Sequence, residues 1–229
     1  MTKRMTGKNR KVAIVQAALP LFARKGFAKT TTRDLAQAAG VSEPLLYRHF
    51  PSKEALYLEI QNFSCKGMDP AVKRLLELET STGTLVRLVC YLLRLMILAL
   101  PMGPLGWETR CRLMANSFLE DGGYARVLFK TRFESFCAKL EACREAAIAA
   151  GDAVRGGVTN RNAVRFAHHV GAYIALAHLP KQPVIDYQAR RQELLEQAAA
   201  FVLRGMGLTD VALQRYLNAK TLARMARED

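Results

Sequence analysis

The chain has 229 residues, and half of them are hydrophobic, so it can bury a substantial core as one large or two small domains. Its formal net charge of +14 favours an anionic partner such as nucleic acid or a membrane surface. The most apolar stretch, residues 85–100, carries Arg87 and Arg94 and is too short to span a bilayer, and no signal peptide is recognisable. We therefore expect a cytoplasmic protein with no membrane partner.

Positive charge is concentrated near the N-terminus. Residues 1–60 hold half of the net charge in about a quarter of the length, as a site for a polyanion would require. A solvated basic tail is the alternative interpretation. The five cysteines, at positions 65, 90, 111, 137 and 143, form no Cys-x-x-Cys pair and lie mostly in apolar helical stretches. They are interpreted as buried thiols in a reducing compartment.

Apolar residues recur at three- and four-residue spacing along the whole chain, which predicts an all-α protein. Gly26, Gly40 and Pro51 separate the first four helices. The expected helices span residues 9–25, 32–39, 42–50, 52–64, 70–79, 84–100, 106–118, 122–150, 160–179, 184–205 and 209–226. The clearest loops are the Pro- and Gly-rich run 101–106 and the Gly-rich segment 151–160.

The stretch 30–50, TTTRDLAQAAGVSEPLLYRHF, has the pattern of a helix-turn-helix. Ala36 leaves room for a crossing helix, and Gly40 supplies the positive φ that ends the first helix. Thr31 with Asp34 can form a capping box, and Ser42 can cap the second helix with Pro44 in its first turn. The apolar residues spaced to share a small core are Leu35, Ala39, Val41, Leu46 and Phe50.

The second helix of this motif is expected to present Glu43, Pro44, Leu45, Arg48 and His49 outward, with Tyr47 to one side. In a major groove, Arg can bind guanine, an acid can accept from cytosine N4, and apolar groups can touch a thymine methyl. Other polar groups suit phosphates, which position a protein without specifying sequence; these are Thr32, Tyr47, His49 and Lys53. The alternative is a helix-turn-helix used for protein contact or plain packing.

Over residues 10–62 the sequence resembles the tetracycline-repressor (TetR) family of bacterial regulators, through LFARKGF, the stretch 30–50 and PSKEALYLEI. The resemblance implies a homodimer on a pseudo-palindromic double-stranded operator, with a C-terminal effector pocket and repression relieved by a small ligand. It implies phosphate contacts by Thr32, Tyr47, His49 and Lys53, and base-facing positions for Arg33, Glu43, Pro44, Leu45 and Arg48. Ser42, which caps the second helix, completes the expected DNA-binding set.

Two residues depart from the family pattern. Pro20 lies inside the first helix, where it removes a backbone hydrogen bond, so a kink or bulge is expected there. Leu45 stands where the family often has a small or polar residue, which weakens direct hydrogen-bond readout. The expected domains are residues 1–64, the helix-turn-helix domain, and residues 65–229, the effector-binding and dimerisation domain.

Soft and bulky side chains in the C-terminal part could line an effector cavity for an apolar or aromatic ligand. They are Cys90, Met96, Trp107, Met114, Phe118, Phe129, Phe133 and Cys137. Filling of an ordinary core is the alternative for each. Dimerisation is predicted through 160–179 and 184–205, where a ridge of small residues allows close helix approach. The candidates are Ala167, Val170, Gly171, Ile174, Ala175, Leu194, Ala198, Phe201 and Val202, and packing within one subunit is again the alternative.

No metal or other cofactor is expected. His168 and His169 are adjacent on a helix and point about 100° apart, so they cannot face one ion, and His178 suits a helix C-terminus. The sequence shows no carboxylate pair, catalytic triad or phosphate-binding glycine loop that would indicate an enzyme. A regulator is therefore favoured over a small helical enzyme, and a basic nucleoid-type or scaffold protein without an effector is the third possibility.

Overall fold

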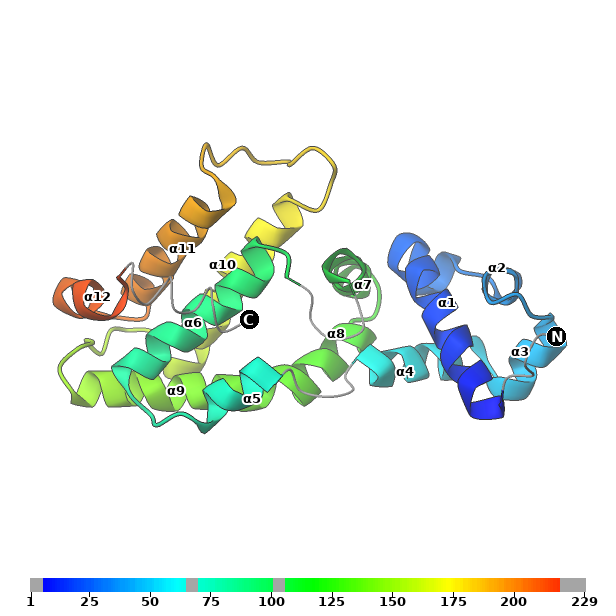
Figure 1. Cartoon of the computed structure of the whole chain (residues 1–229), viewed down its shortest axis with the longest axis horizontal. Coiled ribbons are helices and arrows are strands. Elements are labelled where there is room, and N and C mark those ends of the chain that lie inside the picture. The colour runs from blue at the N-terminus through cyan, green and yellow to red at the C-terminus, as the bar shows by residue number, and fades with distance from the viewer. Residues whose placement is uncertain (1–5, 65–69, 101–105, 219–229) are drawn as a thin grey trace. The chain divides into compact units, whose positions relative to one another are not determined.

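The computed structural model describes residues 6–64, 70–100 and 106–218, and this part of the chain is helical with no β-strand. The all-α prediction is confirmed (Figure 1). The helices are α1 Gly7–Lys29, α2 Thr32–Ala38, α3 Glu43–His49, α4 Lys53–Ser64, α5 Pro70–Glu77, α6 Thr82–Ile97, α7 Trp107–Leu119, α8 Gly123–Leu128, the π-helical turn η1 Phe129–Phe133, α9 Glu134–Ala149, α10 Asn160–Ala177, α11 Arg191–Gly205 and α12 Asp210–Tyr216. Cys65, most of the loop 101–106 and the end of the predicted helix 209–226 lie outside the described residues.

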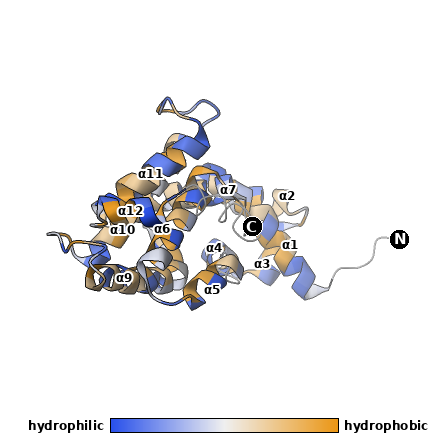
Figure 2. Cartoon of the chain, turned by 60° about the vertical axis from the view of Figure 1, so that its left-hand side comes forward, coloured by the Kyte–Doolittle hydropathy of each residue, from blue (hydrophilic) through white to orange (hydrophobic). Residues whose placement is uncertain are grey.

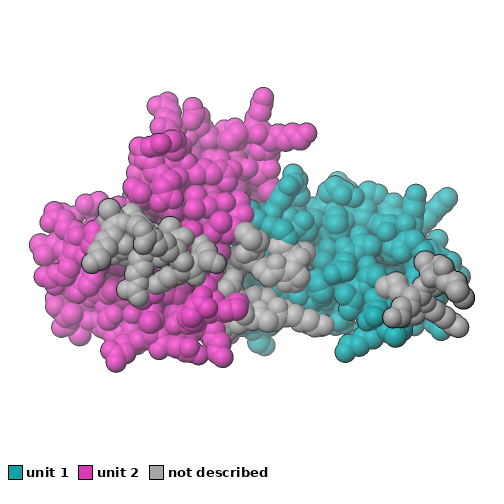
Figure 3. Space-filling model, in the orientation of Figure 1, with its two compact units in different colours: residues 1–67, 103–131 teal, residues 68–102, 132–229 magenta. Residues whose placement is uncertain are grey.

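The chain divides into two compact units (Figure 3). Unit 1 comprises residues 1–67 and 103–131, and unit 2 comprises residues 68–102 and 132–229. Unit 1 therefore contains α7 and α8 in addition to the segment 1–64 predicted as the helix-turn-helix domain. The reason is packing: Leu113 of α7 and Tyr124 of α8 belong to the same apolar core as Phe22 and Leu19 of α1.

In unit 1, α1 is the central helix, in contact with α2, α4 and α7. Thr6 caps its start by accepting from the amide of Asn9, and Ile14, Ala18 and Phe22 recur on its buried face. The kink or bulge expected at Pro20 is not found: the backbone keeps helical φ and ψ angles at this residue. The break lies at Gly26 instead, which has a φ of +76°.

Unit 2 is built around α6, whose residues are buried over most of its length and which contacts α9, α10, α11 and α12. Figure 2 shows hydrophilic and hydrophobic residues alternating along α11, as an amphipathic helix packed on a core requires. Among the described residues, no helix is long and apolar enough to cross a membrane.

Two predicted helices differ from the structure. The segment 122–150 is divided into α8, η1 and α9, because one π-helical turn interrupts the α-helical hydrogen bonding. The segment 184–205 begins its helix only at Arg191. Residues 178–190 form a connection instead, which holds Pro180 and Pro183 and a positive φ of 50° at Gln188.

Candidate nucleic-acid interface

The turn between α2 and α3 is fixed by local hydrogen bonds. Thr31 Oγ1 accepts from the amide of Asp34 at 3.1 Å, and Asp34 Oδ2 accepts from the amide of Thr31 at 3.1 Å, so the predicted capping box is confirmed. Ser42 Oγ accepts from the amide of Leu45 at 3.4 Å. Gly40 has a φ of +60°, as the predicted turn requires.

The inner sides of α2 and α3 meet a single apolar core. Leu35, Leu46 and Phe50 are buried in it, as predicted, whereas Ala39 and Val41 are partly buried and pack at its edge. Lys11 of α1 lies with its Nζ 5.3 Å above the ring of Phe50. Because the inner sides of α2 and α3 pack on this core, the side chains on their outer sides are held at fixed positions.

The ten residues predicted to meet DNA all have accessible surface in unit 1. Five are exposed and the others are partly buried. The exposed residues are Arg33, Ser42, Pro44, Tyr47 and Arg48, and the partly buried residues are Thr32, Glu43, Leu45, His49 and Lys53.

Thr32, Tyr47 and Lys53, three of the four side chains assigned to phosphates, line one shallow hollow between α2, α3 and the start of α4. Leu35, Leu46, Phe50, Ser52 and Leu56 complete its lining. The hollow therefore brings together three residues with hydrogen-bond donors of the kind that bind phosphate oxygens, around a lining that is mainly apolar. His49 is not among the lining residues.

Lys53 is held by contacts that its sequence position does not reveal. Its Nζ donates to the carbonyl oxygen of Phe27 at 3.0 Å and to that of Thr30 at 3.2 Å, and it lies 4.3 Å above the ring of Phe27. An ammonium group has three donors, so a further donor is available to an anion. The end of α1 thus fixes the ammonium at the hollow.

Glu43 is also held in place. Its carboxylate Oε2 accepts from the hydroxyl of Thr32 at 3.0 Å, which joins the first residue of α3 to the first residue of α2. A residue expected to face bases and one expected to face phosphates are therefore bonded to each other. The sequence spacing of eleven residues gives no sign of this bond.

Asp34 contributes to the electrostatics of the same region. Its pKa is lowered from 3.8 to about 2, first by the amide hydrogen bond from Thr31 and then by the hydrogen bond from Lys25. Lys25 Nζ lies 3.0 Å from Asp34 Oδ2. The negative charge of Asp34 is thus paired with Lys25 of α1, and Arg33 and Arg48 are exposed cations on α2 and α3.

The predicted effector residues fall in both units. Cys90, Met96, Phe133 and Cys137 belong to the core of unit 2 or pack against it. Trp107, Met114, Phe118 and Phe129 lie in the segment assigned to unit 1, where Met114 packs on that unit's core and Phe118 is 63% exposed. The structure therefore does not gather all eight around one core.

Most of the predicted dimer residues pack inside unit 2. Ala167, Ile174, Leu194, Ala198 and Val202 are buried in its core, Ala175 is buried, and Val170 packs against the core. A Cβ on Gly171 would lie 2.8 Å from Met96 Sδ and 2.9 Å from Leu93 Cδ2, so the small-residue ridge brings α10 close to α6 of the same chain. Of the nine residues, Phe201 stands out as exposed.

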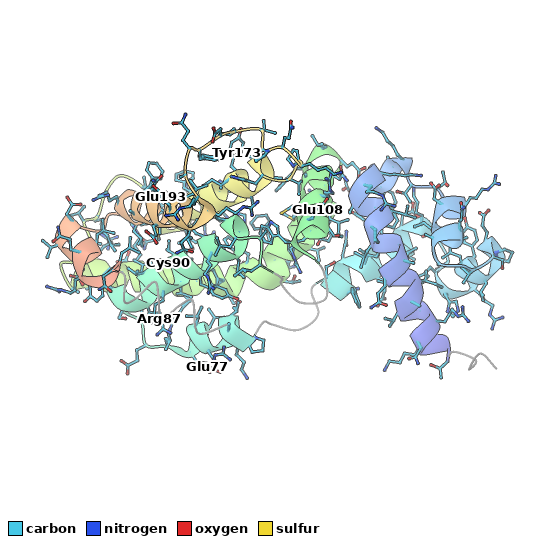
Figure 4. All side chains as sticks on the ribbon, turned by 45° about the horizontal axis from the view of Figure 1, so that its top comes forward. Glu77, Arg87, Cys90, Glu108, Tyr173 and Glu193 are labelled. Atoms are coloured by element: carbon cyan, nitrogen blue, oxygen red, sulfur yellow. The ribbon has the colours of Figure 1, made fainter. Side chains whose placement is uncertain are left out.

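The outer side of α10 carries a different apolar stripe, which the sequence analysis missed. Phe166 is 55% exposed, Tyr173 is 63% exposed and Leu176 is also exposed. Figure 4 shows Tyr173 on α10 and Cys90 on the core helix α6. The seven-residue spacing of Phe166 and Tyr173, opposite the Ala and Gly ridge, is the signal that could have identified it.

The histidines outside α3 lie on α10 or at its end. His178 is the C-terminal cap of α10, the position predicted for it, and its Nδ1 lies 2.8 Å from the carbonyl oxygen of Ile174. His168 has its ring centroid 4.6 Å from that of Phe133. Burial, and then the neighbouring His169, lower the pKa of His168 from 6.5 to about 4.

Residues 14–60 match the family model described as bacterial regulatory proteins of the tetR family. This segment contains all ten residues predicted to meet DNA. Over this segment the chain is similar to the TetR family.

Among curated relatives, the nucleoid occlusion factor SlmA of Vibrio vulnificus is 41% identical over 86 residues, which are 37% of this chain and 44% of SlmA. The regulator EthR of Mycolicibacterium smegmatis is 41% identical over 71 residues, which are 31% of this chain and 30% of EthR. The chain thus matches less than half the length of either relative. The fold of AibR, solved with isovaleryl coenzyme A and operator DNA, is similar with a TM-score of 0.59 at 17% identity, covering 84% of this chain and 97% of AibR.

Proposed function

We propose that the chain is a DNA-binding transcriptional regulator, a cytoplasmic homodimer that represses transcription until a small apolar or aromatic ligand releases it from its operator. In this proposal the chain has no catalytic role. The observation that carries it is the match of residues 14–60 to the tetR family model, on a segment where Arg33 and Arg48 are exposed and Thr32, Tyr47 and Lys53 line one hollow. Such residues suit double-stranded DNA, because polar side-chain donors can bind the backbone phosphates and arginine can bind guanine in the major groove.

The proposed reading surface is the outer side of α3 together with Arg33 of α2. Arg33 and Arg48 carry the expected sequence specificity, because Pro44 and Leu45 offer no side-chain hydrogen-bond donors. Lys53 is expected to bind phosphate, and its hydrogen bonds to Phe27 and Thr30 hold the ammonium in position. Two such surfaces in a dimer would reach successive major grooves, about 34–36 Å apart.

For the dimer face we propose the outer sides of α10 and α11, which contact one another. Phe166, Tyr173 and Leu176 of α10 and Phe201 of α11 are exposed there, and an apolar surface of this kind commonly marks a subunit interface. Tyr173→Asp is expected to give a monomer in light scattering. Val211→Asp is the matched control, because Val211 is similarly exposed but lies on α12.

For the effector we propose a site that includes Met96, Phe133 and Cys137, which are partly buried and pack against the unit 2 core. Met is readily repacked around an apolar ligand, and the Phe133 ring already contacts His168. A ligand that binds here would raise the melting temperature of the protein. Met96→Ala, which removes a side chain that would contact the ligand, is expected to reduce that shift while DNA binding persists.

Binding of the purified protein to DNA from its own upstream region, against random DNA at about 150 mM salt, tests the proposal. Specific regulation predicts a clear preference for the upstream DNA, which Arg33→Ala reduces by about 5- to 150-fold. Lys53→Ala is expected to weaken binding to both DNAs alike. Equal wild-type affinity for the two DNAs would contradict specific regulation and favour a basic nucleoid-type protein.

A further inference from the structure

The hydrogen bond between Thr32 and Glu43 has a consequence for binding. Thr32 Oγ1 donates to Glu43 Oε2 at 3.0 Å, and a hydroxyl carries one proton. Thr32 also lines the hollow with Lys53 and Tyr47, and a phosphate oxygen bound there would be a competing acceptor for its hydroxyl. Thr32 therefore cannot donate to Glu43 and to a phosphate at the same time.

The charge of Glu43 adds a second constraint. It is an acid on a surface whose exposed neighbours on α2 and α3 include Arg33 and Arg48. Released from Thr32 beside a duplex, its carboxylate meets phosphates of like charge unless it finds a donor on a base edge. In the major groove the suitable donor is the N4 amino group of cytosine. Specificity often relies on such a repulsive group, because it penalises the wrong partner.

We propose, building on the DNA-binding function above, that the Thr32–Glu43 hydrogen bond is a specificity lock. On DNA without a suitably placed cytosine the lock stays closed, and Thr32 makes no phosphate contact. At the operator, Glu43 turns to cytosine N4 and the hydroxyl of Thr32 passes to a backbone phosphate. A base contact and a phosphate contact are thus gained together, and Glu43 becomes the residue that couples them.

The first test is selection of binding sites from a randomised duplex library. The wild-type protein is expected to select cytosine at one symmetric position in each half-site, by roughly 5- to 150-fold over other bases. Glu43→Gln should change that preference to adenine, because an amide can bind adenine N6 and N7. Glu54→Gln removes the same charge from an exposed residue in the first turn of α4 and should leave the selected base unchanged.

The second test is a double-mutant cycle on the selected operator with Thr32→Val, Glu43→Ala and the double variant, because the amide oxygen of a glutamine could still accept from Thr32. If the hydrogen bond is a lock, either single change already opens it, so the double variant loses more affinity than the product of the two single losses. If the hydrogen bond instead persists in the complex and positions Glu43, each single change destroys the same contact and the double variant loses less. Thr32→Ser, which keeps the hydroxyl, should behave like the wild type.

Thermal unfolding of each variant confirms that the fold is retained. A wild-type protein that selects no sequence from the library would contradict the proposed function itself. Two results would overturn the lock and still support a sequence-specific regulator. One is selection of a DNA sequence without a cytosine preference that depends on Glu43. The other is a double variant that loses less affinity than the product of the two single losses.

Discussion

The side-chain amide of Asn116 donates to the carbonyl oxygen of Ala23 at 2.9 Å, so α7 binds the last helical turn of α1 before its break at Gly26. On the other side of the break, Glu120 accepts from the amides of Phe27 and Ala28 at 3.3 and 3.2 Å. The break frees backbone donors and acceptors, and α7 satisfies both kinds. The carbonyl oxygen of Phe27 in turn accepts from Lys53. The hydrogen bond from Phe27 to Glu120 and the one from Lys53 to Phe27 therefore link the end of α7 to the hollow.

Asn116→Ala is expected to lower the free energy of unfolding by about 1 kcal/mol, because it leaves the carbonyls of Phe22 and Ala23 without their amide donor. Glu120→Ala should speed hydrogen exchange at the amides of Phe27 and Ala28. Urea unfolding and amide exchange measure these effects. Glu108→Ala is the control on the same helix, because its exposed pair with Arg112 should contribute less than about 0.5 kcal/mol. Equal losses in the three variants would contradict the assigned role of α7.

The helix-turn-helix could be predicted well from the sequence, because its determinants are local. The Thr31 and Ser42 caps act over three residues, and Gly40 needs only its own positive φ. The break in α1 was misplaced at Pro20 for the opposite reason. The partner of the true break, Glu120, lies more than ninety residues further along the chain, where local patterns carry no information.

Asp34 gives a pH dependence of stability. Its pKa is about 2 in the folded protein against an ordinary value of 3.8, which we take for the unfolded chain, so its stabilising effect is complete above about pH 4 and is lost as the pH falls toward 2. The wild type should exceed Asp34→Asn in unfolding free energy at pH 7, and the difference should shrink steadily below pH 4. A difference that stays constant down to about pH 2 would show that the charge of Asp34 has no role.

His168 has the opposite chemistry, because burial disfavours its charged form. Its pKa is about 4 in the folded protein and 6.5 when unperturbed, so the folded state is penalised as the pH falls from 6.5 toward 4. His168→Phe should remove this loss of stability, since the ring packs against Phe133 without titrating. His169→Phe, at the exposed neighbour, is the comparison and should keep most of the pH-dependent loss, because burial is the larger cause of the lowered pKa of His168. Thermal melts between pH 4 and 7.5 distinguish the two.

The dimer prediction shows what spacing can and cannot establish. Ala167 and Gly171 correctly indicate that another helix approaches α10 closely, but the pattern does not say which helix. That neighbour is α6 of the same chain, through Leu93 and Met96. The exposed stripe with Tyr173 could be recognised only after the buried side of α10 had been identified.

Gly171 and Gly205 provide a matched test of this packing, since both lie in helices of unit 2. A methyl group at Gly171 would lie 2.8 Å from Met96 Sδ and 2.9 Å from Leu93 Cδ2, whereas nothing lies within 4 Å of one at Gly205. Gly171→Ala is therefore expected to lower the free energy of unfolding by about 1–2 kcal/mol, because overpacking exceeds the gain in helix propensity. Gly205→Ala should raise it by up to about 1 kcal/mol, because only the propensity changes. If chemical denaturation showed that both changes stabilise the protein, α10 would not pack against α6 at this distance, and the small-residue ridge would again be free to meet a second subunit.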